Sequence, residues 1–584
     1  MTDKTTYPSN PPIPFNSGAV RPRYGKLYWL AFLLGLVYYF GMGAFPMGPF
    51  KGDGTGMASG ARQILEQSWD GPKIEYGRDT RPGVFLSLIF LRWLSGADTY
   101  LMFSAIALAA GVANVLLVAW FAAHYSRLPV PLCGLGVLIL FPDAVTWGCY
   151  PNGTVIAGCL GTASLCLLTR RDQISTLGLV LAGVAAGLAV LFRVDAVLLG
   201  LTSVVLLSTR NVRATAVRLG IFNIAAVVVV GIGLYAIRFD VVAVLQRAHQ
   251  TIDLTVRPPL GESLFMRLAS HEGFTACLAY FPLLTVLLIF TGIFRLFRQR
   301  RWDVLAMVAA GVVPIVAVYR TLTYGSPLYF LAALFACLAA VGVQGIMTAA
   351  RRNQIVLGIA AGLLFAVQYP VGINLSLRSK SRYPVAEPTL VHLGEWQLSS
   401  SPISKIALGI GPGGSVANTE NVRFCSGLLF HPLALHNVKR QINEAFEAMK
   451  QAIQSHEAER PPLLVYTSEW CTNTQVHKAL QDLGYTCVER AHVGLADTPG
   501  DRFVWRRDRF TIIHLDAWEI YAPWNHPEYF QDAPSRQRFL YVTGGGREQD
   551  KIEKSGHVRK ALFRRDVMPS ESVSVFEMDM NPVR

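Results

Sequence analysis

The chain has 584 residues, of which 52% are hydrophobic and only 16% are charged, and its mean hydropathy is +0.35. Soluble globular chains carry about 25% charged residues, so this composition excludes a disordered protein and argues against an ordinary cytosolic multidomain enzyme. The net charge of +14 would suit nucleic-acid binding, but basic residues in a membrane protein mark its cytoplasmic loops. The first 24 residues are polar and rich in proline, so we expect no cleavable signal peptide.

Apolar runs occupy most of the chain from residue 27 onward. A membrane helix needs roughly 20 mostly apolar residues, and by this measure the chain offers about eleven spans. They lie near 27–46, 99–122, 130–148, 153–169, 176–192, 194–208, 218–238, 275–297, 303–319, 328–348 and 355–372. We therefore expect a polytopic α-helical membrane protein.

Basic residues lie in alternate loops between these spans. If residues 1–26 form a cytoplasmic tail, every short inside loop contains a basic residue, as the positive-inside rule requires. These loops hold His124, Arg127, Arg170, Arg171, Arg210, Arg213, Arg218, Arg295, Arg298, Arg300, Arg301, Arg351 and Arg352. An odd number of spans then places the chain after about residue 373 outside the cytoplasm. No nucleic-acid partner is needed to explain the positive charge. A bacterial inner membrane is the expected location.

The composition changes after residue 372, where long apolar runs end and charged residues increase. Strand-like segments lie at Lys405–Gly411, Leu463–Ser468 and Phe539–Thr543, and Asn437–Glu457 has the spacing of an amphipathic helix. We expect residues 373–584 to form an extracytoplasmic α/β domain after a membrane domain at 27–372.

The first external loop, 47–98, has the most specific pattern in the chain. Asp53 stands between glycines just beyond the first span, and a helix-compatible stretch, Met57–Trp69, follows it. The turn Arg78-Asp79-Thr80-Arg81-Pro82 then leads into an amphipathic segment that ends near Ser95. This segment of about 14 residues is short for a span, so we expect a helix lying at the membrane surface.

This order of features resembles the GT-C superfamily of membrane glycosyltransferases. The similar features are the acidic residue after the first span, two juxtamembrane helices separated by a basic residue and proline, and a short second external loop. They continue with a small-residue helix that ends in a basic residue, here AGVAAGLAVLFRVDAVLL with Arg193. The resemblance covers about residues 27–370 and implies a sugar donor carried on a polyprenyl phosphate.

The resemblance also implies a role for each matching residue. Asp53 corresponds to the external carboxylate that acts as general base on the acceptor hydroxyl, and Arg81 and Arg193 correspond to basic residues at the lipid phosphate. Arginine suits phosphate because its planar guanidinium donates several hydrogen bonds. Further phosphate-binding candidates at the expected external face are Lys73, Arg78 and Arg320.

The second external loop departs from the family pattern. Related enzymes often have an acidic residue there, whereas this chain has Asn152 at about that position and Asp143 nearer the preceding span, with no Asp-X-Asp. We therefore expect metal-independent transfer with no required cofactor, although a divalent cation stays an open alternative. Asp143, Asn152 and Tyr324 are candidates for contacts with the acceptor or sugar.

Structural roles compete with these functional ones. Arg81 has the position of a headgroup anchor as well as a phosphate ligand, and Arg193 has a possible ion-pair partner in Asp195. In an oxidising compartment, Cys471 and Cys487 are candidates for a disulfide. The histidines are too scattered to indicate a zinc site.

The sequence thus predicts a membrane glycosyltransferase that transfers a sugar from a polyprenyl phosphate to an extracytoplasmic acceptor with inversion. The alternatives are a transporter or a flippase for lipid-linked sugars, and a noncatalytic assembly protein. Charges that collect at span ends, rather than at the membrane midplane, argue against transport.

Overall fold

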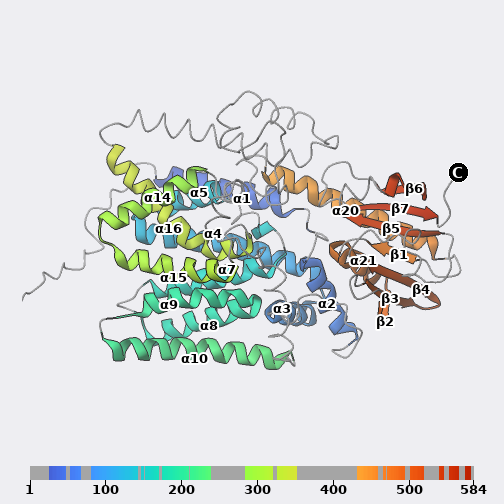
Figure 1. Ribbon diagram of the computed structural model, residues 1–584, viewed down its shortest axis with the longest axis horizontal. Helices are drawn as coiled ribbons and strands as arrows, with labels where there is room; N and C mark the ends of the chain where they lie inside the picture. The colour runs from blue at the N-terminus through green and yellow to red at the C-terminus, as the bar shows by residue number, and fades with distance from the viewer. Residues whose placement is uncertain are drawn as a thin grey trace, which may run out of the picture.

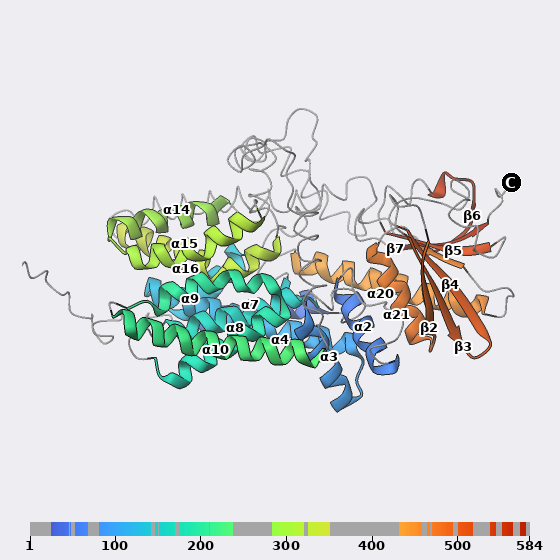
Figure 2. The same cartoon turned by 60° about the horizontal axis from the view of Figure 1, so that its bottom comes forward.

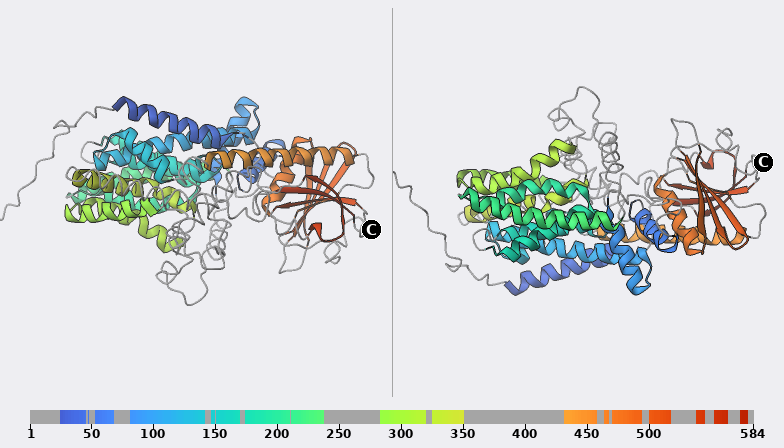
Figure 3. Two further views of the ribbon diagram at one scale, coloured as in Figure 1. Left: turned by 90° about the horizontal axis from the view of Figure 1, so that it is seen from above. Right: turned by 90° about the horizontal axis from the view of Figure 1, so that it is seen from below.

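The computed structural model describes two packed parts of the chain, a helical bundle and a sheet domain (Figure 1). The described residues are 25–45, 47, 53–67, 81–141, 147–149, 151–169, 174–209, 211–237, 283–319, 325–350, 431–457, 464–467, 470–493, 500–517, 538–544, 552–563 and 573–579. The helix α20 (His431–His456) extends from the bundle toward the sheet domain (Figure 3).

Most described helices of the bundle fall on the predicted apolar runs, and α2 and α3 fall on the two helical segments expected in the first external loop. They are α1 (Gly25–Ala44), α2 (Asp53–Gln67), α3 (Pro82–Ser95), α4 (Thr99–Ser126), α5 (Val130–Leu140), η1 (Trp147–Cys149), α7 (Gly153–Leu168), α8 (Thr176–Phe192), η2 (Val194–Leu199), α9 (Gly200–Leu207), α10 (Val212–Ala236), α14 (Leu283–Arg298), α15 (Trp302–Tyr319) and α16 (Gly325–Ala350). The expected span at 355–372 lies outside the described residues. Within the described ranges, three helices are long and apolar enough to cross a bilayer, namely Thr99–Ser126, Val212–Ala236 and Tyr329–Met347. The predicted total of about eleven spans stays a prediction.

The bundle packs through small residues as well as through a hydrophobic core. Gly183 and Gly187 of α8 lie against backbone carbonyls of α10, where a Cβ atom would collide with the facing helix. Gly292 of α14 and Gly342 of α16 face each other's helices in the same way. Such close backbone approach is typical of helices packed within a membrane, where lipid tails provide no hydrophobic force between them.

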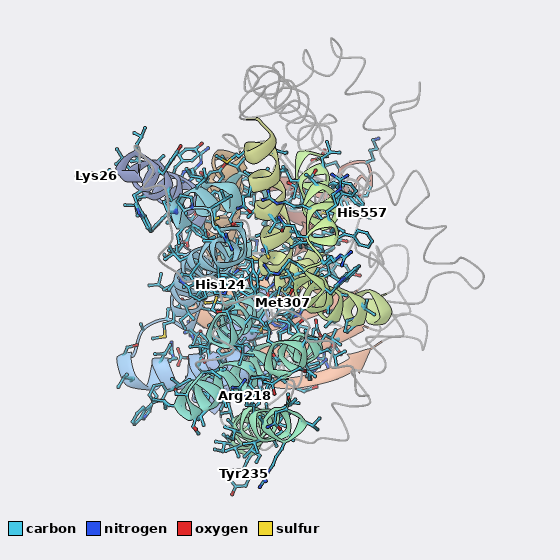
Figure 4. All side chains as sticks on the ribbon, turned by 90° about the vertical axis from the view of Figure 1, so that its left-hand side faces the viewer. Lys26, His124, Arg218, Tyr235, Met307 and His557 are labelled. Atoms are coloured by element: carbon cyan, nitrogen blue, oxygen red, sulfur yellow. The ribbon has the colours of Figure 1, made fainter. Side chains whose placement is uncertain are left out.

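Large apolar side chains also cover the outside of the bundle. Tyr235 of α10 is 88% exposed, whereas Met307 of α15 is 1% exposed, and Figure 4 shows them at the edge and in the middle of the helices. The outer sides of α1 and α10 expose further large apolar residues, which are Leu27, Trp29, Leu30, Leu33, Leu34, Val37, Val212, Val217, Ile224, Val227, Val228 and Ile232. Exposed apolar surface of this extent fits contact with lipid.

The bundle has two chemically different ends. Arg127 follows α4 in a left-handed conformation with φ 60°, and Arg300 follows α14 with φ 55°. These turns lie at the end far from the sheet domain, whereas α2 and α3 lie at the end beside it (Figure 2). The basic turns and the first external loop are therefore at opposite ends, as the predicted topology requires.

The sheet domain has seven strands in the order β2-β3-β4-β1-β5-β7-β6. The strands are β1 (Leu464–Thr467), β2 (Thr486–Val493), β3 (Gly500–Arg507), β4 (Phe510–Ala517), β5 (Arg538–Gly544), β6 (Val558–Phe563) and β7 (Val573–Asp579). β1 pairs in parallel with β4 and β5, and the other pairs are antiparallel. The expected strands at β1 and β5 are confirmed, while Lys405–Gly411 lies outside the described residues.

Two helices cover one face of this sheet. They are α20 (His431–His456), which confirms the amphipathic helix expected at 437–457, and α21 (Trp470–Asp482). Alternation along β1 separates the two faces, because Val465 belongs to the core beneath the helices and Tyr466 to the core on the other face. On the face of the sheet that the helices cover, α21 contacts α2 of the bundle.

Candidate active site

Asp53 is the first residue of α2, and its side chain lies outside the described part of the structure. The next residue, Gly54, fixes where this helix begins. A Cβ atom at Gly54 would collide with the carbonyl oxygen of Pro151, so only glycine permits this approach. The backbone of the candidate base is thereby held beside residues 151–153, which lead into α7.

Arg81 lies at the start of α3 because proline follows it. Pro82 occupies the first turn of the helix, and the residue before a proline avoids the helical conformation, so Arg81 is a non-helical N-cap with φ −142° and ψ 54°. Its Nη1 atom lies 4.0 Å from the sulfur of Met57 in α2, and its Cδ atom lies 3.5 Å from the position of a Cβ on Gly153. Arg81 therefore lies between α2 and the start of α7.

Arg193 stands in the extended break between α8 and η2. Its Nε atom donates to Asp195 at 2.7 Å, and its Nη1 atom donates to the hydroxyl of Thr154 at 2.7 Å. The predicted pairing of Arg193 with Asp195 is thus confirmed. The ion pair and the hydroxyl together orient the guanidinium at the first turn of α7.

The N-terminus of α7 is the common point of these contacts. Gly153 lies against the carbonyl of Phe192 at the end of α8 and against Val84 of α3, at 2.9 and 3.0 Å from the position of a Cβ atom. Asn152 caps the helix, because its side-chain oxygen accepts from the amide and the hydroxyl of Thr154 at 2.9 and 3.0 Å. Backbone amides at a helix N-terminus favour anions, as do two arginines. The start of α2, Arg81 and Arg193 are therefore brought together around one anion-favouring position.

The helix α2 is buried on almost all sides despite its few large apolar residues. Thr55, Ala58 and Ser59 are at most 3% exposed, because α2 is packed between α3, α4 and α21. The hydroxyl of Thr55 lies 3.1 Å from that of Tyr100, and the hydroxyl of Thr99 donates to the carbonyl of Ala58 at 2.8 Å. Small residues are needed along α2 because three neighbouring helices approach it closely.

The other predicted site residues divide into three groups. Asn152 has a described role as a helix cap, and its contact with a sugar or acceptor stays a prediction. The residues that lie outside the described part of the chain are Lys73, Arg78, Asp143, Arg320 and Tyr324. Within the described residues, no group of three or more His, Cys, Asp or Glu side chains is placed to hold a metal ion. Metal-independent transfer stays a prediction.

The predicted disulfide between Cys471 and Cys487 is wrong. Cys487 is a free, buried thiol that donates to the carbonyl of Glu489 at 3.5 Å, and burial raises its pKa to about 12. Cys471 is in the first turn of α21, and its side chain lies outside the described residues. Because the thiol of Cys487 is free, it forms no bridge with Cys471 in the structure.

The chain is similar to solved structures of membrane transferases, although no family model and no curated relative matches its sequence. The crystal structure of ArnT from Cupriavidus metallidurans in the apo state is similar over 94% of this chain and 98% of that one, with 15% identity and a TM-score of 0.53. ArnT bound to undecaprenyl phosphate matches over 95% and 98%, with the same identity and TM-score.

The chain shares the fold of ArnT. ArnT, the lipid A aminoarabinose transferase, is a member of the GT-C superfamily, and the similarity covers both the bundle and the sheet domain. The resemblance expected from the first external loop is therefore confirmed at the level of the fold. At 15% identity this likeness concerns the fold alone.

Several residues at the site were not predicted. No sequence motif indicates a role at the site for Thr154, because its importance depends on contact in space with Arg193, which is 39 residues later in the chain. Arg62 was missed for the same reason, since its partners in α21 are about 420 residues away. No pattern within one sequence reports such long-range contacts.

Proposed function

We propose that the protein is an integral membrane glycosyltransferase that uses a polyprenyl-phosphate-linked sugar. The observation that supports this most directly is the convergence of the Asp53 end of α2, Arg81 and Arg193 at the N-terminus of α7. A base, two guanidiniums and a helix N-terminus are the groups that transfer from a phosphate carrier needs. The ArnT fold, with one ArnT structure bound to undecaprenyl phosphate, supports the same class of donor.

The proposed reaction is a single displacement at the sugar. The carboxylate of Asp53 removes the proton of the acceptor hydroxyl, and the oxygen attacks the anomeric carbon while the bond from that carbon to the phosphate oxygen breaks. The carrier phosphate takes the electron pair and the added negative charge, which Arg81 and Arg193 stabilise. Because there is one attack and no covalent enzyme intermediate, the sugar's configuration inverts.

The same arrangement supports a membrane setting for the proposed reaction. The site lies at the end of the bundle beside the sheet domain, opposite the basic turns, and we place it at the extracytoplasmic face of a bacterial inner membrane. The acceptor is then a protein, glycan or lipid outside the cytoplasm. The sheet domain shares this side of the membrane.

The test is transfer by the purified full chain in lipid nanodiscs, supplied with a panel of labelled polyprenyl-phosphate sugars. Asp53→Asn should lower the transfer rate by a factor of about 10² to 10⁴, the usual contribution of a general base. Asp98→Asn is the matched control, because Asp98 only caps α4 and asparagine caps a helix equally well.

Transfer by Asp53→Asn at close to the wild-type rate would remove Asp53 from the mechanism. A flippase would instead move the lipid-linked sugar between leaflets and release no glycosylated product. A noncatalytic assembly protein would tolerate both Asp53→Asn and Arg81→Ala.

A further inference from the structure

The sheet domain binds α2 on the side that faces away from α3 and α4. The hydroxyl of Ser59 donates to the side-chain oxygen of Gln481 in α21 at 2.9 Å, and the side-chain nitrogen of Gln481 donates back to the carbonyl of Ser59 at 3.2 Å. Ser59 is 3% and Gln481 4% exposed. This reciprocal pair is therefore shielded from competition by water.

An ion pair one turn further along α2 continues the contact. Arg62 donates through Nη1 to a carboxylate oxygen of Asp482 at 2.7 Å and through Nη2 to the carbonyl of Gln481 at 3.0 Å. The side chains of Arg62 and Asp482 are only 19% and 22% exposed. A fork of two hydrogen bonds fixes the direction of the guanidinium as well as its distance.

Further residues extend this contact on both sides. Lys478 of α21 donates to the second oxygen of Asp482 at 2.7 Å, and its ammonium lies 5.4 Å from the ring of Tyr100 in α4. On the other side, Glu66 accepts from Arg62 at 2.8 Å and lies 3.5 Å from Arg92 of α3. We call Ser59, Arg62, Gln481 and Asp482 the α2–α21 clasp.

The clasp acts on the element that begins with the candidate base. Ser59 is six residues from Asp53 along the same helix, a distance of about 9 Å. A helix of this length moves as one body, so a shift at Ser59 moves the N-terminus of α2 relative to α7. In the bundle alone, α2 has small side chains and contacts α3 and α4, which leaves its far side to α21.

We propose that the sheet domain positions the active site by holding α2 through the clasp, with Arg62 and Gln481 as positioning residues. The inference rests on the proposed function only in that Asp53 is the base that α2 positions. The clasp stays closed during transfer, because opening it would expose the buried Ser59–Gln481 pair.

The experiment compares Arg62→Ala, Arg62→Lys and Ser59→Ala in the full chain in nanodiscs. The matched control is Arg490→Ala, which removes an Arg–Asp pair of the same length, 2.7 Å to Asp501, within the sheet domain. Amide hydrogen exchange in α2 is measured first. Arg62→Ala should raise exchange of residues 54–67 at least tenfold while α4 stays protected, and Arg490→Ala should leave α2 unchanged.

Transfer kinetics give the second reading. Arg62→Ala should lower kcat about tenfold with the donor KM within threefold of wild type, because Arg81 and Arg193 still hold the phosphate. Arg62→Lys, which keeps the charge, and Ser59→Ala, which removes one hydroxyl, should fall between Arg62→Ala and wild type. Ser59→Ala is the mildest of these changes, so it still tests the clasp if Arg62→Ala aggregates.

The measurements distinguish failure of the clasp from failure of the proposed function. Exchange of α2 that is the same in wild type, Arg62→Ala and Ser59→Ala would overturn the clasp, whatever the activity. A wild-type chain that transfers no sugar from any donor would overturn the proposed function, while the exchange rates would still decide whether the sheet domain holds α2. A kcat for Arg62→Ala equal to that of Arg490→Ala would also overturn the positioning role.

Discussion

Thr154 connects the cap of α7 to the candidate phosphate site. Its hydroxyl donates to Asn152 and accepts from Arg193, so one fully buried oxygen links the helix cap to the guanidinium. Asp195 holds the same guanidinium from the other side. Arg193 is thus oriented by two partners, and removing one leaves it less well directed.

We predict that Thr154→Val raises the donor KM about tenfold and changes kcat less. A hydrogen bond to a charged group contributes about 1.5 to 3 kcal/mol, and a change of 1.4 kcal/mol is tenfold in affinity. Titration of the transfer rate with donor measures this. Thr162→Val, the same substitution at another buried site on α7, is the control, and an unchanged donor KM in Thr154→Val would contradict the role.

At the scale of elements, the contact between α2 and residue 151 decides where the first external loop sits. Gly54 has no space for a side chain because the obstacle is backbone, the carbonyl of Pro151, which cannot rotate away. Gly41 of α1 is the opposite case, since a Cβ there would meet nothing within 4 Å. The two glycines therefore provide a matched pair.

We predict that Gly54→Ala lowers the transfer rate at least tenfold and destabilises the protein by about 1 to 3 kcal/mol, the usual cost of overpacking. Gly41→Ala should leave transfer unchanged and stability equal or slightly higher, because alanine favours a helix. Thermal unfolding and initial transfer rates check both. Equal behaviour of the two variants would show that α2 does not press against Pro151.

A second element contact, between α21 and the sheet, contains two buried histidines. His477 and His514 lie with ring centroids 5.0 Å apart, and among the described residues His477 has no hydrogen-bond partner for either ring nitrogen. Burial lowers the pKa of His477 well below its usual value and lowers the pKa of His514 to about 3. Both imidazoles are therefore neutral in the folded domain.

Acid destabilises the sheet domain through these two histidines. Unfolded histidines titrate near pH 6.5, so between pH 6.5 and about 3 the unfolded chain binds more protons than the folded one. Stability therefore falls with acid, by up to about 1.4 kcal/mol per pH unit for each histidine. We predict that the urea midpoint for unfolding of the sheet domain is lower at pH 5.0 than at pH 7.5. Limited proteolysis at increasing urea concentration measures this midpoint. His477→Phe should roughly halve this difference, and an unchanged difference would exclude His477 as its source.

Elements were predicted better than contacts. The apolar runs located the helices of the bundle because hydrophobic length is a local property, and the Arg81-Pro82 turn located the start of α3 because proline acts on its neighbour. The Arg193–Asp195 pair was likewise within reach of local reasoning. The free thiol of Cys487, the role of Thr154 and the α2–α21 clasp depend on chain segments that meet only in the folded molecule.

At the scale of the whole molecule, the two ends of the bundle differ in charge and in partners. Basic residues gather where α4 and α14 end, and the sheet domain, α2 and α3 gather at the opposite end (Figure 1). The positive-inside rule predicts that the basic end faces the cytoplasm.

We predict that labelling with a membrane-impermeant maleimide separates these ends. Ser95→Cys, at the exposed end of α3, should react in intact spheroplasts, whereas Gln299→Cys, in the exposed turn after α14, should react only after permeabilisation. The wild-type chain gives the background from its own cysteines. Labelling of Gln299→Cys from outside would reverse the topology and move the proposed site to the cytosol.

The clasp also sets an order of events during biosynthesis. Ser59 precedes Gln481 by 422 residues, and at about 5 to 20 residues per second the ribosome needs about 20 to 80 s to make the intervening chain. Throughout that interval the first loop has left the ribosome without its partner from the tail. In the proposed enzyme, a newly inserted chain is thus incomplete at its reaction centre until its last domain has been exported and has folded, so the final step of maturation would also be the one that starts its activity.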